Sequence, residues 1–202
     1  MKKITFAMAP ITLLFLAGCV PSIHGLYTDK DTVYDPALVG IWSEPNSTET
    51  WEFTQAGEKA YRLTITEDKG KTGRFQVHLV KLQGKMFLDL FPEDPNLPGN
   101  TDYYKFHLLP VHSFLRLEQI APLLQMAAMN PEGLKNLLKE NPQAIRHEVR
   151  DDQIILTAST PELQKFLLEN LDQPKFFGDF CRMTCQKPQP PSPQPIPPNS
   201  PK

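Results

Sequence analysis

Hydrophobic and polar residues alternate through much of the first half of the chain. In residues 50–54, 61–66 and 74–79, apolar side chains occupy every second position and polar ones stand between them. Successive side chains of a β-strand point to opposite faces, so this period of two predicts strands with one buried face. Such a pattern is typical of antiparallel sheets that leave their other face in water.

The segments between these runs predict a meandering sheet. Connections such as residues 67–73 are short, polar and glycine-bearing, and Gly84 marks a tight hairpin that leads into residues 85–91. Strand-like composition resumes at 103–109 and 114–118. We count about seven to nine strands, which either close into a barrel or form an open sheet covered by helices.

Two segments of the second half predict helices. Asn130 is placed to cap one helix and Pro131 to occupy its first turn, and Thr160 and Pro161 repeat this arrangement thirty residues later. After each start, leucines recur at the spacing of an amphipathic helix, so each helix needs a surface to bury against.

The remaining segments of the second half complete the predicted fold. Residues 145–149 and 154–157 flank a polar turn and predict a hairpin between the two helices, while residues 121–129 allow a third short helix near Pro122. The chain is therefore expected to be an α+β protein, with a mainly antiparallel sheet or barrel and two to three covering helices.

The N-terminus has the layout of a secretory signal. Lys2 and Lys3 precede an apolar run, residues 4–17, that is shorter than the roughly 20 residues of a membrane-spanning helix. The tetrapeptide LAGC at 16–19 resembles the lipobox of bacterial lipoproteins. That resemblance implies cleavage before Cys19, acylation of its thiol and attachment to a membrane. The alternative is an ordinary signal peptide with an incidental cysteine.

The lipobox sets the expected domain organisation. Residues 1–18 are the signal peptide, 19–38 a lipidated tether, 39–186 a single domain, and 187–202 a disordered tail with eight prolines in its 16 residues. The tail is either a docking strip for another protein or an end with no partner. By analogy with enterobacterial lipoproteins, Val20 after the cysteine implies the outer membrane, with the domain facing the periplasm.

Charge and motifs argue against several classes of function. The net charge is −2 and the pI about 6.2, which is unlike a nucleic-acid-binding protein. The chain contains no Gly-x-Ser-x-Gly elbow, P-loop, dinucleotide fingerprint or His-Glu-x-x-His sequence. We therefore expect a protein that is not an enzyme and takes no cofactor or metal, with its five scattered histidines in solvent. Because exported proteins keep disulfides, Cys181 and Cys185 are expected to form one near the end of the domain.

A second resemblance suggests where a ligand would bind. Gly40 and Trp42, in LVGIWSE, resemble the Gly-x-Trp element of lipocalins, which implies a lipocalin-like barrel able to hold one apolar molecule. The chain is also similar to a group of bacterial lipoproteins whose activity is not established. The candidate lining of a cavity is Trp51, Phe53, Tyr61, Leu63, Phe75, Val77, Met86 and Leu88. Alternatively, the same residues fill a dry core.

Two functions remain open at this point. The first is non-catalytic binding of a lipid or other apolar molecule at the membrane. The second is a structural or assembly role, in which a sheet face or the proline-rich tail binds another envelope protein. A cavity would distinguish the two.

Overall fold

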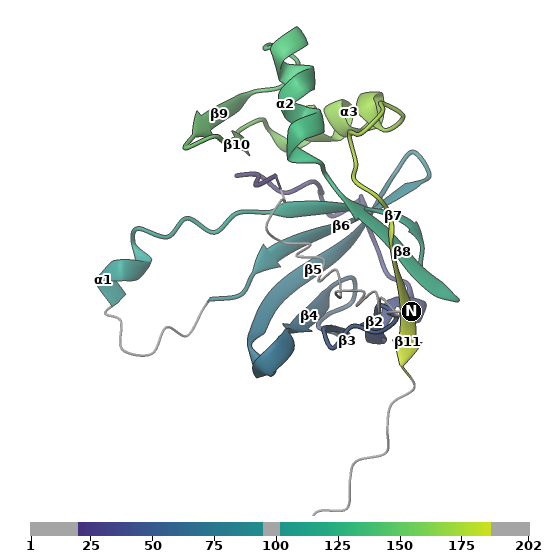
Figure 1. The fold of residues 1–202 in the computed structure, drawn as a ribbon. Coiled ribbons are helices and arrows are strands. Elements are labelled where there is room, and N and C mark those ends of the chain that lie inside the picture. The colour runs from purple at the N-terminus through teal and green to yellow at the C-terminus, as the bar shows by residue number, and fades with distance from the viewer. Residues whose placement is uncertain (1–19, 95–101, 187–202) are drawn as a thin grey trace, which may run out of the picture.

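The computed structural model describes residues 20–94 and 102–186, and shows an antiparallel barrel with its two longer helices together on one side (Figure 1). The strands are β1 (Thr32–Val33), β2 (Gly40–Ser43), β3 (Thr50–Gln55), β4 (Tyr61–Thr66), β5 (Thr72–Leu82), β6 (Lys85–Pro92), β7 (Ser113–Gln119), β8 (Leu123–Ala128), β9 (His147–Arg150), β10 (Gln153–Leu156) and β11 (Cys181–Gln186). The α-helices are α1 (Asp102–Lys105), α2 (Pro131–Glu140) and α3 (Thr160–Asn170), and two short 3-10 helices are η1 (Pro36–Leu38) and η2 (Asp68–Gly70).

Eight strands close the barrel in the order β2-β3-β4-β5-β6-β7-β8-β11, and every pairing is antiparallel. The long strand β5 pairs with β4 through residues 72–77 and with β6 through residues 75–82. On the other side, β11 pairs with β8 through residues 181–184 and with β2 through residues 184–186. Of the two predicted architectures, the structure therefore has the barrel and not the open sheet.

The alternating apolar positions point into this barrel. Every barrel strand contributes buried side chains to one interior cluster, whereas the intervening residues Glu52, Arg62 and Gln76 are exposed. The interior cluster contains Leu38, Trp42, Trp51, Phe53, Tyr61, Leu63, Ile65, Val77, Leu79, Leu88, Leu90, Leu115, Leu117, Leu124, Met126, Cys181 and Met183. The period-two prediction is confirmed because a closed antiparallel sheet buries one face of each strand.

A second core lies between the outside of the barrel and the helices. Val80, Phe87 and Phe114 point outward from their strands and pack in one cluster with buried residues of α2, α3 and β10. Figure 1 shows α2 and α3 on the same side of the barrel, with the β9–β10 hairpin beside them. This hairpin forms a separate two-stranded sheet, as the sequence predicted.

The two predicted helices form, and their starts follow the capping rules. The Asn130 side chain accepts hydrogen bonds from the backbone of Glu132 and Gly133, which confirms its role as a cap. In α3 the cap is Ser159, one residue earlier than predicted, and it forms a capping box with Glu162. The predicted cap, Thr160, instead donates its hydroxyl proton to the carbonyl oxygen of Gly25 at 2.8 Å.

Two segments differ from their predicted secondary structure. Residues 103–109 hold the short helix α1 and exposed chain in place of a strand, while residues 123–128, where a short helix was possible, form β8. The reason is that a strand is stabilised by its neighbours more than by its composition. Strand β8 pairs with β7 on one edge and with β11 on the other. The local sequence of residues 123–128 does not indicate either pairing.

The segment that follows Cys19 is part of the folded domain and not a tether. Val20, Ser22 and Leu26 are between 0 and 3 % exposed. Ser22 exchanges two backbone hydrogen bonds with His112, at 2.9 and 2.8 Å, and the backbone of Leu156 bonds to the neighbours of Ser22 on both sides. The predicted boundary at residue 39 is therefore wrong, because residues 20–38 supply buried side chains and strand-like pairing to the fold. The predicted signal peptide, Cys19 and the predicted tail lie outside the described residues.

Candidate functional site

The predicted cavity-lining residues all lie at the barrel interior, but most of them face no open space. Trp51, Phe53, Tyr61, Leu63, Val77 and Leu88 are at most 1 % exposed, and Phe75 and Met86 are partly buried against them. A side chain that a water-sized sphere cannot touch lines no cavity large enough for water. These six side chains therefore fill the barrel core in this conformation, which is the alternative that the sequence left open.

The polar groups of Tyr61 and Trp42, which are buried in the barrel, form hydrogen bonds with the backbone of residues 35 and 38. The Tyr61 hydroxyl accepts a hydrogen bond from the backbone N–H of Asp35 at 2.7 Å and lies 3.1 Å from the carbonyl oxygen of the same residue. Burial raises the pKa of Tyr61 to about 12. The indole of Trp42 donates to the carbonyl oxygen of Leu38 at 2.9 Å, so both polar aromatic residues tie the chain around η1 to the barrel. Their hydrogen bonds indicate a structural role.

The predicted disulfide between Cys181 and Cys185 is wrong. Both thiols are free and both residues belong to β11. Four residues of extended strand separate their Cα atoms by roughly 13 Å, well beyond the reach of a disulfide. Cys181 is buried in the barrel core, where burial raises the pKa of its thiol, and Cys185 is exposed. The prediction failed because it treated as a loop the strand that closes the barrel.

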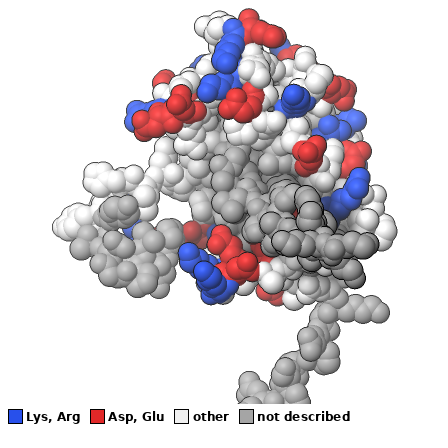
Figure 2. Space-filling model, viewed as in Figure 1, with Lys and Arg blue, Asp and Glu red and all other residues white. Residues whose placement is uncertain are grey.

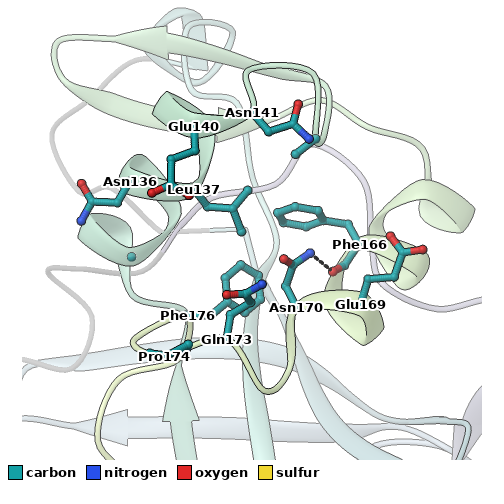
Figure 3. Close-up of a pocket in the computed structure, with 12 residues that line it drawn as sticks. Asn136, Leu137, Glu140, Asn141, Phe166, Glu169, Asn170, Gln173, Pro174 and Phe176 are labelled. Carbon is teal, nitrogen blue, oxygen red and sulfur yellow. Dashed lines mark hydrogen bonds between the residues drawn. The ribbon is translucent and has the colours of Figure 1, made fainter.

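A cleft of about 470 Å³ lies outside the barrel, between α2 and α3 (Figure 3). Its walls are the facing sides of the two helices, and the segment after α3 forms its base. The lining residues are Gly133, Asn136, Leu137, Glu140, Asn141, Ala144, Phe166, Glu169, Asn170, Gln173, Pro174 and Phe176. None of the predicted cavity residues is among them. The candidate site therefore lies in the helical layer and not inside the barrel.

The floor of the cleft is apolar and rigidly supported. Figure 3 shows Leu137 of α2 and Phe166 of α3 pointing toward one another, with Phe176 below them. The rings of Phe166 and Phe176 meet edge to face, with centroids 5.5 Å apart. At Gly133 a Cβ atom would stand 2.0 Å from the backbone oxygen of Lys175, so only glycine allows α2 to lie this close to the base.

The rim of the cleft is polar and electronegative. Both helices end here: Glu140 and Asn141 stand at the C-terminus of α2, and Glu169 and Asn170 at that of α3. Helix C-termini carry a partial negative charge, and Lys and Arg are missing from the described residues that line the cleft. Lys165 lies 3.7 Å from Glu169, whereas Glu140 has no such ion pair among the described residues. The arrangement favours a ligand with an apolar part and a positive charge.

Sequence reasoning found part of this cleft. The leucine stripes and the helix boundaries were predicted, which places Leu137 and Phe166 on buried helix faces. The base was missed because Gln173, Pro174 and Phe176 lie in irregular chain that carries no periodic signal. A usable signal was the pair of adjacent aromatic residues at 176–177, which follow a proline and a lysine and lie outside the predicted strands. Two large apolar side chains in such a segment are expected to be buried against another part of the fold.

A buried carboxylate forms a second polar cluster, on the outer side of β6. Asp89 is 1 % exposed; it accepts a hydrogen bond from the Leu26 backbone at 2.6 Å and another from Nδ1 of His112 at 2.6 Å. His78 lies on the neighbouring strand opposite Asp89, and burial lowers its pKa while Asp89 opposes that shift. Two of the histidines expected in solvent are thus largely buried. The cluster fastens residues 20–26 to the barrel, which is a structural role.

Other kinds of site were sought in the same part of the chain. No group of three His, Cys, Asp or Glu side chains in residues 20–94 and 102–186 has an arrangement that could hold a metal ion. Across these residues, every helix is too short or too polar to cross a bilayer. Comparison of the chain with protein-family models, curated proteins and solved structures found no match.

Proposed function

We propose that the protein is a lipid-anchored envelope protein that binds a small amphipathic molecule, without catalysis, in the cleft between α2 and α3. The observation that carries this proposal is the contrast between a filled barrel interior and an open cleft of about 470 Å³. Binding sites for small molecules are concave and occupy volumes of this order. Here an apolar floor at Leu137, Phe166 and Phe176 is surrounded by a polar rim, which suits an amphipathic molecule better than a purely apolar one.

The lining of the cleft suggests the chemistry of the ligand. An apolar stem would lie against Leu137 and Phe166, where it would leave water. A positively charged head would lie near Glu140 and the ends of the two helices, where the partial charges of the backbone are negative. The ligand therefore belongs to the class of cationic amphiphiles, in place of the purely apolar molecules expected for a hollow barrel.

The membrane anchor is a separate element of the proposal. It rests on the lipobox at residues 16–19 and on the positively charged start of the chain. Acylation of Cys19 would hold the cleft close to a lipid surface, and several acyl chains together give stable attachment, since each buried methylene adds about 0.8 kcal/mol. Of the lipocalin-like properties implied by Gly40 and Trp42, the proposal keeps the small barrel, as a scaffold for the helices, and gives up the ligand cavity inside it.

Titration with octylammonium, using octanoate as the anionic control, tests the cleft. Two-dimensional NMR of the protein should show octylammonium shifting resonances of α2 and α3, and octanoate shifting them much less. Leu137→Gln should weaken binding of octylammonium about tenfold, because the loss of apolar contact corresponds to roughly 1–2 kcal/mol. Glu140→Gln should weaken it severalfold.

A matched control separates binding from stability. Leu168 is also partly buried and belongs to the same helical layer, but it lines a different surface hollow. Leu168→Gln should therefore cost similar stability and leave octylammonium binding unchanged. Equal affinity for octylammonium and octanoate would contradict the proposed site. Equal binding of octylammonium by Leu137→Gln and Leu168→Gln would contradict it as well.

The alternative function is assembly with another envelope protein through a sheet face or through the proline-rich tail, of which the tail, residues 187–202, lies outside the described residues. It stays a prediction. Deletion of the tail should leave octylammonium binding intact if the two functions are independent.

A further inference from the structure

An exposed apolar segment follows the start of α1. Tyr103, Phe106, Leu108 and Leu109 are 78, 83, 43 and 66 % exposed, and they make up four of the six large hydrophobic side chains that are exposed in the described residues. Figure 1 shows α1 standing away from the barrel, and in Figure 2 the visible described atoms of this projection are mainly white, whereas charges of both signs are mixed over the helical layer. Clustered exposed apolar side chains mark interaction sites, in contrast to single scattered ones.

The chain path places this segment near the predicted lipid anchor. Ser22 and His112 are paired through two backbone hydrogen bonds. Cys19 precedes Ser22 by three residues, and Leu109 precedes His112 by three residues. Three residues of extended chain span at most about 10 Å, and paired residues lie about 5 Å apart, so Cys19 and Leu109 are separated by no more than about 25 Å.

The structure also removes the spacer between the anchor and the fold. Val20, the residue directly after Cys19, is 3 % exposed and packs in the second core. A diacylglycerol on Cys19 would therefore hold the domain against the bilayer, and not at the end of a flexible tether. The surface around residue 20 then lies at the lipid headgroups.

The composition of the exposed segment fits the interface of a bilayer. Tyrosine favours this layer, where its ring leaves water while its hydroxyl group stays hydrated, and phenylalanine and leucine form the apolar face of segments that lie in it. The charged side chain of the segment, Lys105, lies 3.1 Å from Asp94 and forms an ion pair with it. Because this pair compensates the charge of the lysine, contact of the segment with lipid depends on its apolar side chains.

We propose that residues 103–109 insert their apolar side chains into the interfacial layer of the membrane that Cys19 anchors, and so fix the domain in one orientation. This inference rests on the lipid anchor of the proposed function. Insertion of four large side chains explains why the fold keeps them together in water-exposed chain. One bilayer accounts for both the acyl chain and the segment.

Fluorescence of the acylated, full-length protein in vesicles tests this inference. Vesicles of phosphatidylethanolamine and phosphatidylglycerol, with a fraction of brominated lipid, quench tryptophan only where it enters the bilayer. Phe106→Trp should give blue-shifted emission that the brominated lipid largely quenches, above the background of the buried Trp42 and Trp51. The control is Lys85→Trp, at the opposite end of β6 from the segment, which should stay unquenched.

The outcomes separate the anchor from the segment. Mass spectrometry first shows whether Cys19 is acylated, and flotation shows whether the protein is bound to the vesicles. Absence of acylation refutes the anchor itself. An acylated, vesicle-bound protein whose tryptophan at position 106 is no more quenched than that at position 85 overturns the insertion alone, and equal strong quenching at both positions overturns the fixed orientation.

Discussion

The barrel interior and the helical layer are both apolar cores, but they are built in different ways. Each barrel strand sends alternate side chains inward, and the ring of strands encloses them on all sides. The helical layer is assembled from segments far apart in sequence: residues 20–26, α2, the β9–β10 hairpin, α3 and the chain after it. Two helices cannot cover a curved barrel completely, and the gap between them remains as the cleft. Both cores contribute buried apolar packing, but only the helical layer, which is assembled from separate segments, contains the cleft.

The largest expected effect lies in the barrel. Phe53→Ala should lower the free energy of unfolding by about 3–5 kcal/mol, because the enclosed ring leaves a cavity that its neighbours cannot fill. Phe166→Ala, at the cleft floor, should cost less, since solvent can enter the space that it vacates. Urea unfolding of both variants measures the difference, and equal losses would remove the distinction between an enclosed core and an open one.

Asp89→Asn tests how residues 20–26 are held to the barrel. The amide keeps the shape of the carboxylate but weakens its two hydrogen bonds, so a loss of about 1–3 kcal/mol is expected. Faster hydrogen exchange at the Leu26 amide should accompany it. Asp29→Asn, at an exposed carboxylate, serves as the control and should leave that exchange rate unchanged. Unaltered exchange in Asp89→Asn would mean that Asp89 does not hold this segment.

Gly133→Ala tests the contact that supports the cleft. The added methyl group meets the backbone oxygen of Lys175, so α2 or the base must move, at a cost of about 1–3 kcal/mol. Octylammonium binding should weaken with it. At Gly178 the nearest atom to an added Cβ is 3.7 Å away, an ordinary contact, so Gly178→Ala should be tolerated. If the two variants unfold at the same urea concentration, the close approach at Gly133 is not a constraint.

The smallest effect concerns acid stability at the start of α3. Hydrogen bonds from Arg146 and Ser159 lower the pKa of Glu162 from its ordinary 4.5 to about 2. A carboxylate with a lowered pKa in the folded state stabilises the protein above pH 4.5, and this contribution disappears as the pH falls from 4.5 toward 2. Glu162→Gln should therefore lower stability slightly and by a constant amount from pH 4.5 to neutral pH, and this difference should disappear as the pH falls toward 2. An unchanged acid profile, measured by thermal unfolding, would contradict the shift.

Local patterns predicted the elements better than their arrangement. Trp51 and Phe53 were placed on one face of a strand and Leu63 on the apolar face of the next strand. Asn130 was recognised as a cap. Alternation and capping could be predicted because they depend on neighbours in sequence. Residues 181–186 were interpreted as a disulfide loop and residues 103–109 as a strand. The structures of these two segments depend on which distant strand is available for pairing. Residues 181–186 pair with β8 and β2, and no described strand pairs with residues 103–109.

The candidate site also combines residues that the sequence pattern predicted with a geometry that it did not predict. Leu137 and Phe166 belong to predicted helix faces, yet whether those faces meet tightly or leave a cleft depends on the base at Gln173 and Phe176, and on the contact of Gly133 with Lys175. Packing of this kind is decided by distances between segments, which a periodic pattern does not encode. The filled barrel interior is another such outcome, because alternation identifies the inward face without stating how closely opposite walls approach.

The sequence by itself determined the strands of the first half, the two amphipathic helices and the hairpin between them, since each follows from contacts within a few residues. It also contains LAGC at residues 16–19, a tetrapeptide that resembles a lipobox. Tertiary structure alone decided the closure of the barrel by β11, the incorporation of residues 20–38 into the domain, and the opening between α2 and α3. These three features depend on hydrogen bonds and packing between segments that are distant in sequence, such as Gly133 with Lys175 and Leu156 with the backbone around Ser22. The free energy of these contacts exists only once the chain has folded.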